Sequence, residues 1–229
     1  MGFNIFTLEP KSKLYKLKQS SQNALEHLLK NKIVAIVRGV QPQDVIKIAH
    51  ALVAGGVTTM EVTMNSFNAL SVIKQLGKEM NEKMLIGAGT VLDEKMLKGA
   101  LGAGARFIIS PTVDKKLIRA TKKLGAVSIP GAFTPTEIFK AFSFGGDIIK
   151  VFPTSGDVDY IKELRAPLPH IPLMPTGGIS LQNIQEFKKA GAVAFGIGGS
   201  LVNAKLDVTN EYLQQITDTA KQFMDLVAE

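Results

Sequence analysis

The run "IIKVF" places Lys150 among apolar neighbours, where a lysine is not expected unless it has a task. Burying an isolated ammonium is costly, so a buried lysine normally shifts its pKa or finds a partner. A desolvated neutral amine can attack a ketone and form a Schiff base, which weakens the adjacent carbon–carbon bond. The run therefore predicts an imine-forming lysine.

The run "TTMEVTM" supplies a carboxylate that can serve this lysine. In a strand, Glu61 shares one face with two threonines, while the methionines and the valine occupy the other face. The apolar face should meet helices, so Glu61 points inward and can meet Lys150, where a carboxylate can shuttle protons. The competing interpretation is a buried Lys–Glu ion pair that only holds strands together, and such pairs add little stability.

Two glycine-rich turns, "TGGIS" (176–180) and "GIGGS" (196–200), follow the last two apolar runs of the chain. Glycine lets the backbone approach a ligand closely, and backbone N–H groups at such turns bind phosphate. In barrel enzymes, a phosphate site commonly lies at the turns after the seventh and eighth strands. Together the two turns predict a phosphate site.

Short β-branched runs alternate with segments of helical period along most of the chain. We count eight strand–helix units, which predict an α/β fold and specifically a closed (β/α)₈ TIM barrel with an N-terminal helical extension. An open doubly wound sheet is the competitor, but no GxGxxG opens a first helix. The predicted strands are 32–38, 58–63, 84–90, 106–110, 126–131, 147–152, 171–176 and 192–198. Residues 1–25 form the extension, with a helix expected over 21–31, and residues 26–229 form a single domain.

Composition narrows the classes of function. The 229 residues are 45% hydrophobic and 21% charged and include no cysteine, which fits a cytoplasmic protein without disulfides. The net charge is +7, but six lysines against two glutamates fall within residues 1–32, and no basic stripe with interleaved aromatics predicts nucleic-acid binding. No apolar run reaches the roughly 20 residues of a membrane-spanning helix.

The histidines argue against a metal site. His27 and His50 fall on predicted helices, and His170 precedes the seventh predicted strand, so the three lie far apart. Catalytic zinc sites need several convergent ligands. We therefore expect neither a metal nor another cofactor.

Seven motifs in order resemble the KDPG/KHG aldolase family, the class I pyruvate aldolases, over residues 30–203. These motifs are "EVTMNS", "GAGTV", "ISP", "IPGAFTPTE", "KVFP", "PTGGI" and "GIGGSL". The resemblance implies cleavage of 2-keto-3-deoxy-6-phosphogluconate to pyruvate and glyceraldehyde 3-phosphate. It also implies that many members cleave 4-hydroxy-2-oxoglutarate to pyruvate and glyoxylate, and that members are commonly homotrimers.

The resemblance also assigns roles to single residues. It implies that Lys150 forms the Schiff base and that Glu61 is the general acid/base. It places the remaining candidates around the substrate, with Thr90 and Pro111 lining the pyruvyl part, Phe152 beside the lysine, and Gly177, Gly178, Gly199 and Ser200 at the phosphate. Thr176, which begins the first glycine turn, is a further candidate for substrate binding.

One departure from the family pattern affects substrate binding. Many members read E-V-T-L-R-T, where the arginine grips the substrate carboxylate, but here Asn65 and Ser66 stand in that stretch. Arg38, at the end of the first predicted strand, becomes the leading cation for the carboxylate, with a strand-end salt bridge as its structural alternative. Neither series of substrates, gluconate or galactonate, is favoured by the motifs.

Two other functions compete with an aldolase. A sugar-phosphate epimerase or isomerase would use the same phosphate turns but would not need an interior lysine on the sixth strand. A catalytically silent barrel that senses sugar phosphates would need neither Lys150 nor Glu61.

Overall fold

The computed structural model describes residues 13–228. All nine strands in that range are short and almost entirely buried, as expected of parallel strands covered by helices. The strands are β1 (Ile33–Val37), β2 (Thr59–Thr63), β3 (Leu85–Gly89), β4 (Phe107–Ile109), β5 (Val127–Ile129), β6 (Gly131–Ala132), β7 (Ile149–Val151), β8 (Leu173–Pro175) and β9 (Phe195–Ile197).

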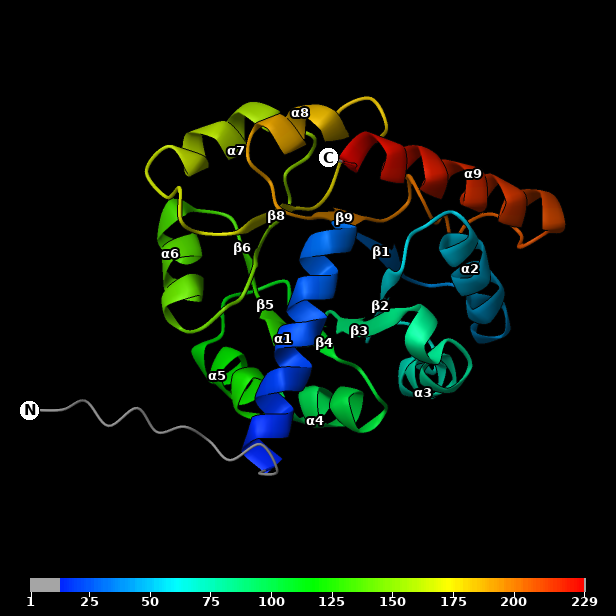
Figure 1. Cartoon of the computed structure of the whole chain (residues 1–229), viewed down its shortest axis with the longest axis horizontal. Coiled ribbons are helices and arrows are strands. Elements are labelled where there is room, and N and C mark those ends of the chain that lie inside the picture. Colours follow the sequence, from blue (N-terminus) through cyan, green and yellow to red (C-terminus); the bar gives the residue numbers. More distant parts are fainter. Residues whose placement is uncertain (1–12, 229) are drawn as a thin grey trace, which may run out of the picture.

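Helices follow most strands and surround them in Figure 1, where α1 crosses in front of the strands. They are α1 (Lys13–Asn31), α2 (Pro42–Ala54), α3 (Ala69–Glu79), α4 (Glu94–Gly102), α5 (Lys115–Lys123), α6 (Pro135–Ser143), α7 (Val158–Arg165), α8 (Ile184–Lys189) and α9 (Asn210–Val227), with a 3₁₀ turn η1 (Asn81–Lys83).

Local sequence signals start several of these helices. The side chains of Asp93, Asp114 and Asp157 accept hydrogen bonds from backbone N–H groups in the first turns of α4, α5 and α7. Thr134 and Glu137 form a reciprocal capping box at the start of α6. These caps fix where each helix leaves the loop that follows its strand.

The strands form two parallel sheets rather than one closed barrel. The larger sheet has the order β5-β4-β3-β2-β1-β9, and the smaller has the order β6-β7-β8. The prediction of a closed eight-stranded TIM barrel is therefore wrong, although the alternation of strands and helices and the parallel pairing are confirmed.

Proline explains both interruptions. The predicted strand 126–131 is split into β5 and β6 at Pro130, which has no N–H to donate to a ladder. At the other junction, Pro172 precedes β8 and Pro175 is its last residue, and an isolated bridge between Thr176 and Gly196 joins this sheet to the larger one.

Inward-facing residues of both sheets form one apolar cluster beneath α1. Ala24 and Leu28 of α1 pack there against Phe107 of β4, Ile148 before β7 and Met174 of β8. The second and larger cluster joins the outer faces of the strands to the surrounding helices. Both sheets thus share an interior that α1 covers at one end.

Helix α1 lies at the amino-terminal ends of the strands, since His27 and Asn31 bond Thr58 just before β2. The predicted boundary after residue 25 falls inside this continuous helix, which starts earlier than the expected 21–31. Residues 1–12 of the predicted extension lie outside the described residues. Because α1 covers the amino-terminal ends of the strands, a functional site is expected at their opposite, carboxyl-terminal ends.

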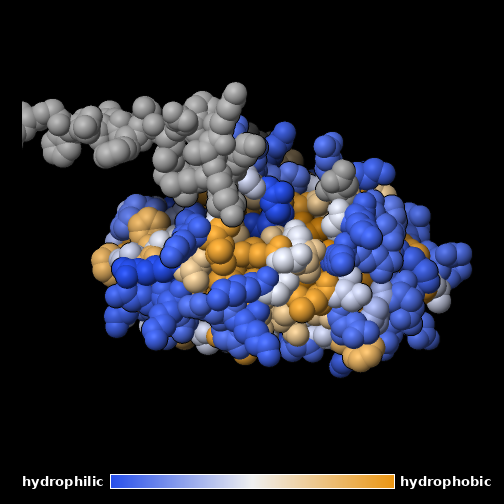
Figure 2. All heavy atoms as spheres, turned by 90° about the horizontal axis from the view of Figure 1, so that it is seen from below, coloured by the Kyte–Doolittle hydropathy of each residue, from blue (hydrophilic) through white to orange (hydrophobic). Residues whose placement is uncertain are grey.

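The face seen in Figure 2 lies below the view of Figure 1, over α3, α4 and α5. Hydrophilic side chains dominate its edges, and hydrophobic ones are visible toward its middle. Among residues 13–228, no helix is long and apolar enough to cross a membrane.

Candidate active site

Lys150 lies in the middle of β7, between Gly131 of β6 and Met174 of β8 in the strand register. Its side chain is buried, at 5% exposure, and its Nζ lies 4.9 Å from the centroid of the Phe152 ring. Burial lowers the pKa of the Lys150 ammonium, while the Glu61 carboxylate raises it and the Arg38 guanidinium lowers it further. The environment thus favours the neutral amine, which is the nucleophilic form.

Glu61 lies in β2 and is 1% exposed. Burial raises the pKa of its carboxyl group, and the positive charges of Lys150 and Arg38 oppose that effect. Its Oε2 atom is buried and has no hydrogen-bond partner among residues 13–228. A raised pKa makes the protonated form of the carboxyl group more accessible, so that the group can both accept and release a proton, as an acid/base group must.

The alternative of a structural Lys150–Glu61 ion pair does not fit this geometry. No salt bridge joins the two side chains in the described part of the chain, although each charge affects the pKa of the other. A pair kept for stability would be in direct contact, because only close geometry offsets the cost of desolvation. The two groups are placed instead to interact through space or through a bound molecule.

Arg38 follows β1 and reaches across to the end of β3. Its Nη2 donates a hydrogen bond of 3.3 Å to Oγ1 of Thr90, a residue held at a φ of 56°. A β-branched residue in this left-handed region is a true outlier, and such strain is concentrated at functional sites. Arg38 forms no salt bridge within residues 13–228, which leaves its charge open to an anionic group.

A cavity of about 470 Å³ opens beside Lys150 at the carboxyl ends of the strands. Its size is that of a site for a small organic molecule. Eight of the predicted residues line it, namely Arg38, Lys150, Phe152, Thr176, Gly177, Gly178, Gly199 and Ser200.

The two glycine turns meet across this cavity. Gly177 and Gly178 adopt φ angles of 95° and 77°, which favour glycine. Ser200 Oγ donates a 2.6 Å hydrogen bond to the carbonyl of Ile179, which ties the second turn to the first. The backbone N–H groups of Gly178, Gly199 and Ser200 donate to no protein acceptor in the described residues, an arrangement suited to an anion.

The other predicted residues lie around this cavity rather than in its wall. Glu61 is buried and is not part of the lining, and Thr90 is linked to the cavity through its hydrogen bond with Arg38. Pro111 lines a neighbouring cavity of about 660 Å³, and Phe152 lines both cavities. The structure therefore brings Pro111 only to the far side of Phe152.

Two residues to which the sequence analysis assigned no role support the site. Ser66 Oγ accepts the N–H of Gly39 at 3.0 Å and lies 2.9 Å from Thr63 Oγ1, so it joins the ends of β1 and β2. Gly89 in "GAGTV" leaves room for the Glu61 carboxylate. The motif indicated the segment, but not which neighbour required the glycine.

Possible metal ligands are scattered. No group of three or more histidine, aspartate or glutamate side chains that could hold a metal occurs in the described range. His27 bonds Thr58, and His170 packs edge-on against Phe142.

Chemically, a buried lysine of lowered pKa and a buried carboxyl group of raised pKa that influence each other's charge are suited to forming an imine and moving protons. The model of the KDPG and KHG aldolase family matches residues 25–219. The chain belongs to this family and is an aldolase, a lyase.

Individual relatives agree with this assignment. The chain is 38% identical to the 2-dehydro-3-deoxy-phosphogluconate aldolase of Pseudoalteromonas atlantica, a match covering 77% of this chain and 82% of the relative. It is 30% identical to the 2-dehydro-3-deoxy-6-phosphogalactonate aldolase of Escherichia coli, covering 85% and 96%. A solved KDPG aldolase from Legionella pneumophila, with pyruvate captured as a covalent carbinolamine, superposes with a TM-score of 0.78 at 27% identity, covering 86% and 96%.

Proposed function

We propose that this chain is a Schiff-base aldolase that cleaves 2-keto-3-deoxy-6-phosphogluconate to pyruvate and glyceraldehyde 3-phosphate. The observation that carries the proposal is the buried Lys150 amine, of lowered pKa, in a cavity that ends in two glycine turns. The relatives named for this substrate support the choice. 4-Hydroxy-2-oxoglutarate, which shares the reacting carbons but lacks phosphate, is the second substrate we propose.

In the proposed reaction, neutral Lys150 Nζ attacks the carbonyl carbon C2 to give a carbinolamine. Protonated Glu61 then gives its proton to the carbinolamine hydroxyl, which leaves as water, so that a protonated imine and the Glu61 carboxylate remain. The Glu61 carboxylate takes the proton of the C4 hydroxyl. The C3–C4 bond then breaks, its electron pair enters the imine to form an enamine, and the aldehyde leaves. The protonated Glu61 returns the proton to C3, which gives the protonated imine of pyruvate. Water then adds to C2 and loses a proton to the Glu61 carboxylate, and the carbinolamine breaks down to pyruvate and neutral Lys150.

The remaining contacts orient the substrate. Arg38 is placed to bind the carboxylate, because its guanidinium lines the cavity and has no acidic partner in the described residues. The glycine turns are placed to bind the remote phosphate through unpaired N–H groups. Binding energy from a remote phosphate helps to position the reacting carbons. We also propose that the protein forms a homotrimer and acts in the cytoplasm.

Borohydride reduction in the presence of pyruvate tests this function. Reduction should fix a pyruvyl group on the peptide that contains Lys150, and Lys150→Met should abolish the label. Lys140→Met is the matched control, because Lys140 lines the neighbouring cavity beyond Phe152. Labelling of another lysine in a folded wild-type protein would refute the mechanism.

A further inference from the structure

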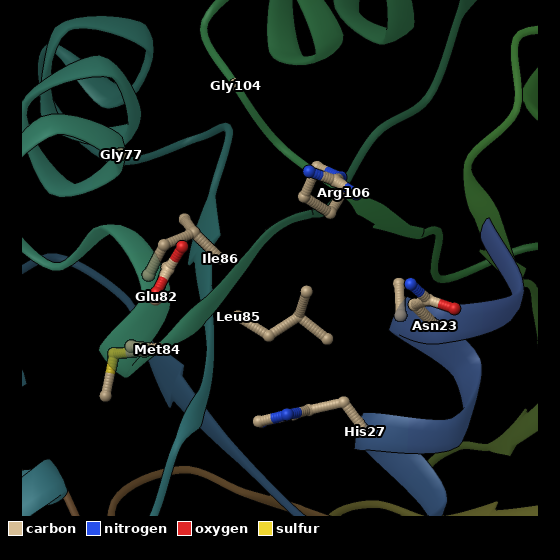
Figure 3. A pocket seen from close by; sticks show the side chains of 10 residues that line it. Asn23, His27, Gly77, Glu82, Met84, Leu85, Ile86, Gly104 and Arg106 are labelled. Carbon is tan, nitrogen blue, oxygen red and sulfur yellow. The ribbon is translucent and has the colours of Figure 1, made fainter. Parts of the chain in front are cut away.

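A groove at the opposite end of the fold plays no part in the proposed reaction. It lies between α1 and the amino-terminal ends of β3 and β4, with a volume of about 260 Å³. Four polar side chains surround its floor in Figure 3, and they come from elements far apart in the sequence. They are Asn23 and His27 of α1, Glu82 of η1 and Arg106 just before β4.

Arg106 makes one side of the groove a hydrogen-bond donor. Its guanidinium bonds Ser20 Oγ of α1 and forms no salt bridge with any described residue. A guanidinium has five N–H donors, so most remain for a ligand. The Asn23 amide, which lines the same groove, also has no partner among the described residues. Arginine binds carboxylates with paired, parallel hydrogen bonds.

Glu82 and His27 supply acceptors. The Glu82 carboxylate has no salt bridge or hydrogen bond within residues 13–228. His27 Nε2 lies 3.1 Å from the carbonyl oxygen of Thr58 and 2.9 Å from its Oγ1. The tautomer with the proton on Nε2 suits the Thr58 carbonyl oxygen, which can only accept, and this tautomer presents Nδ1 as an acceptor.

Apolar side chains form the floor of the groove between the charged groups of Arg106 and Glu82. Figure 3 shows the Leu85 side chain between Glu82 and the α1 residues, and Ala24, Met84 and Ile86 add further apolar side chains to the lining. Arg106 and Glu82 do not pair with each other across it, although both charges are unpaired. A molecule with a carboxylate and an ammonium on a small carbon frame would satisfy both charges at once.

We propose that this groove binds a free α-amino acid. Its carboxylate lies on Arg106 and Asn23, its ammonium faces Glu82 and His27, and its side chain rests on the floor around Leu85. A phosphate ester fits the groove poorly, because a single arginine would face its charge while Glu82 would repel it. The site is separate from Lys150, which lines a cavity at the other ends of the strands.

Calorimetric titration of the full-length protein with individual L-amino acids near neutral pH tests the proposal. We expect at least one to bind with a Kd of about 1 mM or tighter. For the tightest ligand, the carboxylic acid that lacks the amine and the amine that lacks the carboxylate should each bind about tenfold or more weakly.

Matched variants locate the site. Arg106→Gln and Glu82→Gln should each weaken binding about tenfold or more. Lys83→Gln, on the same 3₁₀ turn, and Arg119→Gln, on α5, should leave it unchanged, because neither residue lines the groove. Glu82→Gln does not touch the bond between Arg106 and Ser20, so it tests the ligand site without loosening α1.

Three results would overturn the proposal. The first is no binding of any amino acid up to about 10 mM. The second is binding that survives both groove substitutions, and the third is a carboxylic acid that binds as tightly as its amino acid. Borohydride labelling of Lys150 by pyruvate should be unchanged in both groove variants. The labelling experiment therefore tests the aldolase proposal independently of the amino-acid site.

Discussion

The Glu61 carboxylate fills the space beside Gly89 that any larger residue at that position would need. A Cβ atom at Gly89 would lie 2.5 Å from Oε2 and 2.6 Å from Cδ of Glu61. Gly89 pairs with Thr63 in the register of β2 and β3, so the glycine comes from the strand next to the acid. The position of the proposed proton carrier therefore depends on a neighbour without a side chain.

Gly89→Ala should displace this carboxylate while leaving the protein folded, because the obstacle is the end of a flexible side chain. We expect kcat to fall about tenfold or more, since proton transfer depends on placement, while borohydride labelling of Lys150 is retained. Gly77→Ala on α3 is the control, because its Cβ would approach nothing closer than 4.0 Å. An unchanged kcat in the first variant would mean that the observed position of Glu61 is not the productive one.

The pH at which Lys150 becomes reactive should move in opposite directions when its two charged neighbours are removed. The Glu61 carboxylate raises the pKa of the lysine, and the Arg38 guanidinium lowers it. The rate of labelling by pyruvate should rise with pH as the Lys150 ammonium loses its proton. Glu61→Gln should therefore shift this rise to lower pH, and Arg38→Gln should shift it to higher pH. Single-turnover labelling rates across pH would measure both.

Lys122→Gln serves as the control for that experiment, because Lys122 pairs with Asp147 away from the site. Its profile should match that of the wild type. Shifts of the same sign for Glu61→Gln and Arg38→Gln would contradict the electrostatic account of Lys150.

Thr59 offers a test of stability. Its hydroxyl is fully buried and has no hydrogen-bond partner in the part of the chain that the structure describes, which is costly for a polar group. Thr59→Val keeps the shape and removes that cost, so we expect the free energy of unfolding in urea to rise by about 1 kcal/mol. Thr121→Val should instead lower it by about 1 kcal/mol, because Thr121 Oγ1 donates to the Leu117 carbonyl at 2.8 Å. A loss of stability in the first variant would show that the Thr59 hydroxyl is satisfied.

The centre of the site was predictable from sequence because Lys150 and Glu61 violate the apolar pattern of their own strands. Strand periodicity places each residue on a face without knowledge of the neighbouring strand. The glycine turns were predictable for a related reason, since positive φ angles at Gly177 and Gly178 favour glycine.

Relations between strands were not predictable in this way. Nothing in "GAGTV" says that Gly89 faces Glu61, because register depends on packing across strands. The split of the sheet at Pro130 did have a signal, since proline interrupts ladders inside a sheet. The regular count of eight units outweighed that signal and led to a closed barrel that the hydrogen bonding does not form.

The proposed phosphate binding by the two glycine turns can be tested by adding a negative charge where the backbone has room for a side chain. Gly178 is unsuitable, because a Cβ there would collide with the backbone of Ser155 and Gly156, whereas Gly199 has nothing within 4 Å. Gly199→Asp should cut kcat/KM for the phosphorylated substrate about 10²-fold, or about 2.7 kcal/mol of transition-state binding.

Cleavage of 4-hydroxy-2-oxoglutarate by the same variant should change far less, because that substrate has no phosphate to be repelled. Gly102→Asp on α4 is the charge-matched control, since Gly102 also has nothing within 4 Å and lies outside the cavity. Both kcat/KM values should stay at wild-type level in the control. An equal loss on both substrates in folded Gly199→Asp would mean that the turns do not hold phosphate, because a charge that only repels the phosphate cannot slow a reaction that lacks one.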